Sequence, residues 1–185
     1  MMYQWKKIVV DSMPLLILFM SIEVFAGQTL QHNLNSVLSL PVVLIALPII
    51  NGIGGNIGCI LGARIASALH VGEIKPVITD NRIREDLLTA IVLGIIVYLF
   101  FAIFIYFITR FIKPAMEIDF LRSITLVFLT GCVLVVIVSL ISIATAIISF
   151  KKGMDPDNAI APVVTTVGDT TGIVVLVGLL GVLGI

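Results

Sequence analysis

Charged side chains are scarce in this chain of 185 residues: they make up 12% of it, whereas 59% of the residues are hydrophobic. Such a composition excludes a water-soluble domain, and several apolar runs approach the roughly 20 residues that span a bilayer. The formal net charge is zero and no nucleic-acid-binding motif is present, so nucleic acid is not an expected partner. The expected surroundings are a lipid bilayer.

Cysteine is also rare. Its two copies, Cys59 and Cys132, both lie in apolar segments and lack the clustered Cys and His spacing of a zinc site. We therefore interpret both as small packing residues.

Hydropathy predicts five transmembrane spans with approximate boundaries. They cover residues 9–27, 42–69, 87–108, 124–150 and 161–183. Backbone groups in lipid must be hydrogen-bonded within their own segment, and these segments are too long for barrel strands, so each span is predicted to be helical. The predicted fold is an all-α integral membrane bundle that forms a single domain, residues 1–185, without a soluble regulatory domain.

The connections between five spans carry seven basic residues on one side of the membrane and three on the other. The larger group is Lys6, Lys7, Lys75, Arg82, Arg84, Lys151 and Lys152, and the smaller one is Arg110, Lys113 and Arg122. The excess of positive charge predicts a multi-pass protein of the plasma membrane with a cytoplasmic N-terminus and an external C-terminus. The eleventh basic residue, Arg64, is expected to reach the cytoplasmic interface or to pair with an acid there.

Asp169 is the strongest functional candidate, because it lies in an apolar span where only threonines are polar neighbours. An ionised Asp facing hydrocarbon costs at least about 2.5 to 3.5 kcal/mol, so it should face protein or a water-filled path. Thr165 and Thr166 share its helical face. Carboxylate, hydroxyl and carbonyl oxygens suit hard cations such as Mg²⁺. A structural hydrogen bond to a neighbouring helix is the alternative.

The second span contains a run of helix-weakening residues, Pro-Ile-Ile-Asn-Gly-Ile-Gly-Gly-Asn-Ile-Gly, at positions 48–58. One interpretation is a locally opened helix whose carbonyls, with the amides of Asn51 or Asn56, line a wet cavity. The other is close helix packing, along one stripe of Gly54, Gly58, Gly62 and Ala66 and a second of Gly55, Cys59, Ala63 and Ser67. The two are compatible.

Three further acids are candidates. Glu23, buried in the first span, is either a second cation ligand or a structural partner for Arg64. Asp155 and Asp157 precede the fifth span, where Asp-Pro favours a turn and a helix cap. The same two carboxylates would also raise the local cation concentration near the cytoplasmic end.

Two separated motifs resemble the MgtE magnesium transporters and look most like their eukaryotic solute-carrier relatives. The first is Leu47-Pro-Ile-Ile-Asn-Gly-Ile-Gly-Gly-Asn56-Ile-Gly, continued by Gly62-Ala-Arg64-Ile-Ala-Ser67. The second is Asp155-Pro-Asp-Asn158, followed by Pro162 and Gly168-Asp169. The similarity covers nearly the whole chain in the same five-helix order.

The resemblance implies a two-fold symmetric homodimer with a central ion pathway, lined by the second and fifth helices of both subunits. Asp169 of each subunit would face one hydrated or partly hydrated Mg²⁺, whose waters would contact Asn56 and backbone oxygens. The carbonyl of Thr165 would be placed like a family ligand. Bacterial members sense Mg²⁺ through a long cytoplasmic region before the first helix. We therefore expect gating here to reside in the helices and loops or in a separate regulatory protein.

The predicted function is a divalent-cation channel or transporter, Mg²⁺ first, and not an enzyme. A Na⁺-coupled Mg²⁺ exchanger is the nearest alternative, and it needs a second ion site such as Glu23. Alternatives of a different class are a metal-dependent membrane enzyme that uses Asp155 and Asp157, and a non-transporting assembly subunit. The first requires several acids or a His at one depth, and the second leaves Asp169 unexplained.

Overall fold

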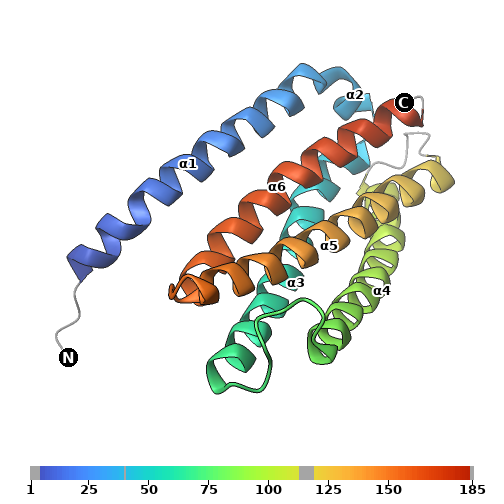
Figure 1. The fold of residues 1–185 in the computed structure, drawn as a ribbon. Coiled ribbons are helices and arrows are strands. Elements are labelled where there is room, and N and C mark those ends of the chain that lie inside the picture. Colours follow the sequence, from blue (N-terminus) through green and yellow to red (C-terminus); the bar gives the residue numbers. More distant parts are fainter. Residues whose placement is uncertain (1–4, 40, 113–118, 184–185) are drawn as a thin grey trace.

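The computed structural model describes residues 5–39, 41–112 and 119–183, and these form an all-α bundle (Figure 1). The helices in the described residues are α1 (Trp5–His32), α2 (Leu34–Ser39), α3 (Pro41–Val71), α4 (Asn81–Ile112), α5 (Phe120–Lys151) and α6 (Pro156–Val182). Four of them, α3 to α6, are long and apolar enough to cross a membrane.

These four helices contain the last four predicted spans. The first predicted span lies within α1, which is not among the four, so the total of five spans stays a prediction. The short α2 was not predicted. Lys113, which the charge count placed on the outer side, lies outside the described residues.

The turns between the long helices follow from local sequence. Gly72 follows α3 and Gly153 follows α5, with φ of 78° and 71°, a left-handed conformation that glycine adopts without steric cost. Asp155 then caps α6 by accepting a 3.1 Å hydrogen bond from the amide of Asp157, and Pro156 occupies the first turn. This tight connection places α5 and α6 side by side in antiparallel orientation (Figure 1).

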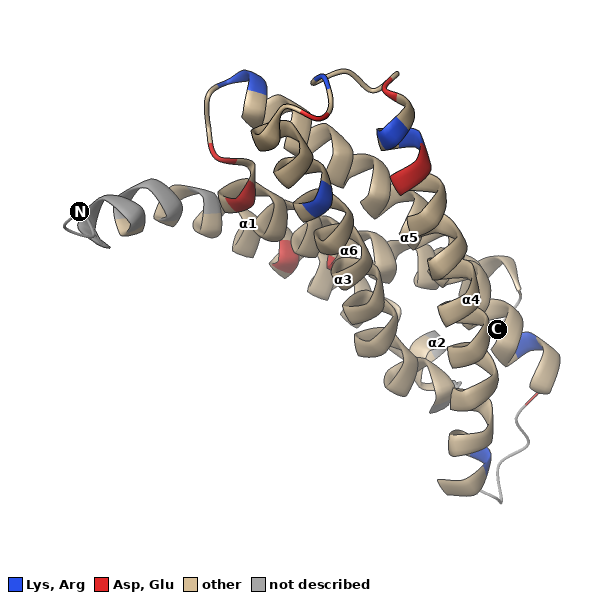
Figure 2. Cartoon of the chain, turned by 90° about the horizontal axis from the view of Figure 1, so that it is seen from below, with Lys and Arg blue, Asp and Glu red and all other residues tan. Residues whose placement is uncertain are grey.

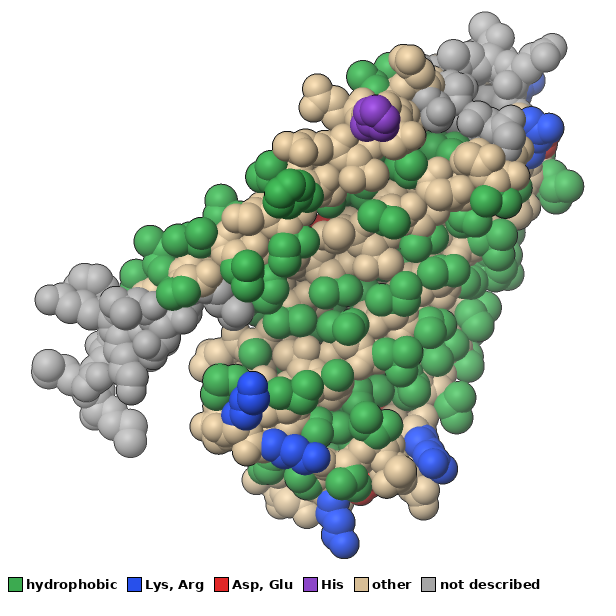
Figure 3. All heavy atoms as spheres, turned by 45° about the horizontal axis from the view of Figure 1, so that its top comes forward, with side chains coloured by type: hydrophobic (Ala, Val, Ile, Leu, Met, Phe, Trp, Pro, Cys, Tyr) green, Lys and Arg blue, Asp and Glu red, His purple; other side chains and the backbone are tan. Residues whose placement is uncertain are grey.

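The centre of the bundle is formed by α3, α5 and α6, which pack against one another, while α4 packs on α5 and α3. Helix α1 runs beside α6 on the outside of this group (Figure 1). Lys and Arg lie mainly toward the two ends of the bundle (Figure 2), and apolar side chains cover much of the flank between them (Figure 3). This distribution is that of a protein with a lipid-facing belt.

Helix α3 is continuous from Pro41 to Val71, so the predicted local opening of the second span is wrong. Close packing explains the glycines instead. A Cβ at Gly54 would lie 2.7 Å from Leu134, one at Gly58 would lie 2.5 Å from Val164, and one at Gly62 would lie 2.5 Å from Ile160. The first predicted stripe therefore lets α3 approach α5 and α6 closely.

The second predicted stripe has a different environment. Gly55 is buried near α6, whereas the side chains of Ala63 and Ser67 are exposed on the surface of the bundle. Asn56 is exposed too. One face of α3 is thus buried in the bundle, and a neighbouring face presents small and polar residues outward.

Candidate metal site between α1, α3 and α6

Asp169 lies on α6, half-buried, and contacts Asn51 of α3. The Asn51 Nδ2 group donates a 3.4 Å hydrogen bond to the backbone carbonyl of Asp169. Asn51 is buried, with 8% of its surface exposed. The structure therefore brings together two of the predicted site residues, one from each of the two helices that carry the sequence motifs.

The oxygen of the Asn51 side-chain amide is an unsatisfied hydrogen-bond acceptor. This Oδ1 atom is buried and has no hydrogen-bond partner among the described residues. It lies against Gly172, where an added Cβ would come within 1.9 Å of it. Since a buried acceptor without a partner is costly, this oxygen is suited to bind a water or a cation beside Asp169.

The carboxylate of Glu23, on α1, lies near Asp169 as well. This carboxylate accepts a 2.9 Å hydrogen bond from the Thr166 hydroxyl and interacts electrostatically with Asp169. Glu23 was predicted to be buried, but it is exposed on α1, while Asp169 is half-buried. Two carboxylates within interaction range repel each other, and a cation between them would remove that repulsion. Glu23 is not the partner of Arg64. Arg64 instead makes a 2.6 Å ion pair with Asp86 of α4, so the alternative in which Arg64 pairs with an acid is the one that the structure supports.

Asn56 and Thr165 lie on the outer side of the contact between α3 and α6, and both side chains are exposed. The two helices are close there, because a Cβ at Gly55 would lie 3.8 Å from the Thr165 methyl group. The Thr165 hydroxyl donates to the carbonyl of Ala161 at 2.8 Å, which leaves its lone pairs free to accept. These two residues therefore form a polar strip on the surface of the bundle and are not part of the cluster around Asp169.

Asp155 and Asp157 are exposed at the beginning of α6 and are not part of the cluster around Asp169. Asp155 has the capping role described above, which was one of its two predicted roles. A second role in attracting cations stays a prediction.

The site offers oxygen donors only. In the cluster around Asp169, carboxylates come from Glu23 and Asp169, an amide from Asn51 and a hydroxyl from Thr166, while the polar strip adds the Asn56 amide and the Thr165 hydroxyl. Within the described ranges, no group of three or more His, Cys, Asp or Glu side chains is placed to hold a metal ion. Mg²⁺ keeps several of its waters in such surroundings, so the donor set of this chain fits a hydrated ion better than a dehydrated one.

Sequence reasoning missed two features of this site. Thr166 was recognised as a neighbour of Asp169, but its bond to Glu23 depends on how α1 packs on α6. Gly172 was not singled out, although it follows Asp169 by three residues and so lies on the same helical face. Its role emerges only when Asn51 is placed against it.

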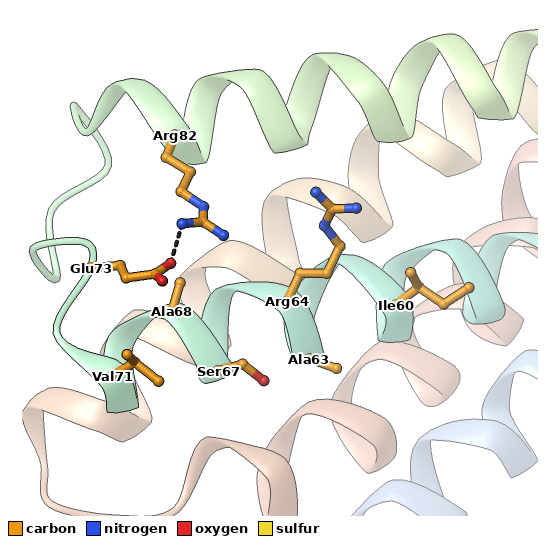
Figure 4. Close-up of a pocket in the computed structure, with 8 residues that line it drawn as sticks. All are labelled: Ile60, Ala63, Arg64, Ser67, Ala68, Val71, Glu73 and Arg82. Carbon is orange, nitrogen blue, oxygen red and sulfur yellow. Dashed lines mark hydrogen bonds and ion pairs between the residues drawn. The ribbon is translucent and has the colours of Figure 1, made fainter.

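A groove of about 570 Å³ lies at the end of the bundle that holds the α3–α4 connection (Figure 4). Its lining includes Ala63 and Ser67 of the exposed stripe and three charged residues, Arg64, Glu73 and Arg82. Figure 4 shows the Arg82 guanidinium bonded to the Glu73 carboxylate. Both arginines of the groove are therefore paired with acids, which offsets their positive charge.

Fold and site together define a multi-pass α-helical membrane protein with an acidic, oxygen-lined site between its spanning helices. The MgtE family model, described as a divalent cation transporter, matches residues 47–179. The chain belongs to this family of divalent-cation transporters, which confirms the resemblance seen in the two motifs.

A human protein, Solute carrier family 41 member 2, is 27% identical to this chain over an alignment that covers 72% of the chain and 25% of the relative. The chain thus spans about a quarter of the length of that relative. No solved structure matches the chain significantly.

Proposed function

We propose that this protein transports Mg²⁺ through a pore formed between two copies of the chain and lined by α3 and α6. The observation that carries the proposal is the cluster at Asp169. It combines two interacting carboxylates with a buried amide oxygen that has no hydrogen-bond partner within the described part of the chain. A hard cation with its water shell satisfies each of these groups.

A second copy of the chain explains the polar strip beside this cluster. Asn56 and Thr165 are exposed on helices that span the membrane, where polar side chains facing lipid are unfavourable. The exposed Ala63 and Ser67 continue the same face of α3 with small residues that allow close helix approach. A two-fold contact along this face would set both strips and both Asp169 residues around one water-filled path.

The groove at the end of α3 would continue this path. It contains Ala63 and Ser67, which lie about two and three turns beyond Asn56 on the same face. The connections at this end carry Lys75, Lys151 and Lys152, so the positive-inside rule places it in the cytoplasm. With Arg64 and Arg82 paired to acids, cations would pass this mouth without a net positive barrier.

A membrane potential would suffice to drive uptake. Moving one charge across 100 mV contributes about 2.3 kcal/mol, and Mg²⁺ carries two charges. A Na⁺-coupled exchanger is the alternative to this pore. The observation that favours the exchanger is the interaction between Glu23 and Asp169, because Glu23 would be a second carboxylate for a second ion. The exchanger differs from the pore in requiring a Na⁺ gradient.

The proposal is tested by Mg²⁺ uptake into proteoliposomes that contain the purified protein. Asp169→Asn keeps the size of the side chain and removes its charge, and we expect it to abolish uptake. Glu85→Gln is the control, since Glu85 is exposed on α4 away from the cluster, and it should retain most of the activity. Equal uptake by wild type and Asp169→Asn would reject Asp169 as the ion-binding residue.

A further inference from the structure

Two buried hydroxyl groups from other helices are bonded to the backbone of α3 on either side of its asparagines. The Tyr98 hydroxyl of α4 donates to the carbonyl of Ile50 at 2.8 Å, and the Ser142 hydroxyl of α5 donates to the carbonyl of Gly58 at 2.6 Å. The two carbonyls are eight residues apart, roughly 12 Å along the helix. Asn51 and Asn56 lie between them.

The packing around the Tyr98 side chain allows its hydroxyl to reach the carbonyl of Ile50. Tyr98 is fully buried, and its ring lies against Gly131 of α5, where an added Cβ would come within 2.2 Å. Its hydroxyl lies 3.0 Å from the position of a Cβ on Gly54. The hydroxyl thus lies against two residues one helical turn apart, bonded to Ile50 and close to Gly54.

Ser142 of α5 also approaches the backbone of α3 closely, at Gly58 and Gly62. A Cβ at Gly62 would come within 2.6 Å of its hydroxyl oxygen, so the bond to Gly58 requires the glycine at position 62. Packing alone does not require a hydroxyl at either place, since Phe and Ala would fill nearly the same space. What the hydroxyls add is a fixed direction, because a hydrogen bond weakens as its geometry departs from linear.

The carbonyl bonded by Tyr98 belongs to the residue directly before Asn51. A small rotation of α3 would therefore move the Asn51 amide relative to Asp169 and Gly172, and it would move Asn56 on the exposed face. We propose that Tyr98 and Ser142 are positioning residues that hold α3 in the rotation at which its asparagines match a hydrated Mg²⁺. This inference rests on the proposed function, and it assigns ion selectivity to two residues that do not touch the ion.

The test compares Mg²⁺ and Ca²⁺ uptake by proteoliposomes containing wild type, Tyr98→Phe and Ser142→Ala. We expect the ratio of Mg²⁺ to Ca²⁺ uptake to fall about fivefold in each variant, the change that corresponds to one neutral hydrogen bond. A merely structural role would reduce uptake of both ions equally and leave the ratio unchanged.

Two control variants match these changes in chemistry. Tyr106→Phe removes a tyrosine hydroxyl farther along α4, and Ser139→Ala removes a buried hydroxyl of α5 that has no hydrogen-bond partner in the described part of the chain. Both should keep the wild-type ratio. If Tyr98→Phe fails to fold, Ser142→Ala decides the question alone.

An unchanged ratio in properly folded Tyr98→Phe and Ser142→Ala would overturn the inference while leaving Mg²⁺ transport intact. A ratio that falls equally in the two controls would overturn it as well. Absence of uptake by wild type would instead reject the proposed function, and this inference with it.

Discussion

The Thr166 hydroxyl donates a 2.9 Å hydrogen bond to the carboxylate of Glu23, a residue 143 positions earlier in the chain. This bond joins α1, the outer helix of the bundle, to the turn of α6 that carries Asp169. The negative charge of Glu23 therefore lies at the candidate ion site, although α1 has little contact with the central helices other than α6.

Removing the charge of Glu23 should weaken ion binding without abolishing it. Glu23→Gln can still accept the bond from Thr166, so α1 should stay in place while the site loses one negative charge. We expect the Mg²⁺ concentration for half-maximal uptake to rise about tenfold, the effect of roughly 1.4 kcal/mol. Concentration-dependent uptake measures this, with Glu85→Gln on exposed α4 surface as the control; equal curves for wild type and Glu23→Gln would contradict the role.

A methyl group at position 172 should disturb the site through Asn51. In Gly172→Ala the new Cβ would lie 1.9 Å from the Asn51 Oδ1 atom, so the amide must shift from its present position. We expect this shift to break the hydrogen bond from Asn51 to the Asp169 carbonyl and to lower Mg²⁺ uptake by at least about tenfold. Gly178→Ala has no atom within 4 Å of its Cβ and should behave like wild type. Full uptake by Gly172→Ala would show that the position of Asn51 does not matter.

The packing of α3 gives a prediction on stability. Gly58→Ala places a Cβ 2.5 Å from Val164 and 3.3 Å from Val138, so the helices must separate. Overpacking of this kind typically costs about 1–3 kcal/mol. Thermal unfolding in detergent should show a lower midpoint for Gly58→Ala than for Gly52→Ala, whose Cβ meets nothing within 4 Å. The reverse order would contradict the packing described for this stripe.

The ion pair between Arg64 and Asp86 should contribute more to the free energy of unfolding than the one between Arg82 and Glu73. The Asp86 side chain is 8% exposed, whereas Glu73 is 48% exposed, so removal of Arg64 leaves a buried carboxylate without its partner. Because Arg64 itself is 58% exposed, solvent limits the effect, and we expect Arg64→Ala to destabilise by about 1–2 kcal/mol. Arg82→Ala should cost less than about 1 kcal/mol.

A double-mutant cycle checks this prediction. If the effect comes from the pair, adding Asp86→Asn to Arg64→Ala should cost much less than Asp86→Asn alone in wild type. Additive losses in unfolding free energy would show that the two residues act independently.

Much of the architecture could be predicted because hydropathy is a property of the sequence alone. Long apolar runs predicted the four helices that can span a membrane. Asn51 and Asp169 were each predicted as candidates, and the structure places them in contact, whereas Asn56, which the resemblance implied beside Asp169, is exposed. The state of α3 could not be predicted. Pro48 and the glycines weaken an isolated helix, and only the neighbours at Leu134, Val138 and Val164 show why these glycines are needed in a continuous one.

The partners of individual side chains also lay beyond sequence reasoning. Glu23 had Arg64 as one candidate partner, but the choice between Thr166 and Arg64 depends on which helix lies beside α1. Tyr98 lies in a span that appears uniformly apolar, so its bond to the α3 backbone carried no sequence signal. Residues that bind or support a site across helices become recognisable only once the helices are packed.

We propose that Mg²⁺ crosses the membrane through this protein down its electrochemical gradient. Mg²⁺ uptake into proteoliposomes with an imposed inside-negative potential, with and without Na⁺, measures this directly. We expect uptake that increases with the potential and does not require Na⁺. No uptake by folded wild-type protein would contradict transport, and uptake that strictly requires a Na⁺ gradient would contradict the pore in favour of an exchanger.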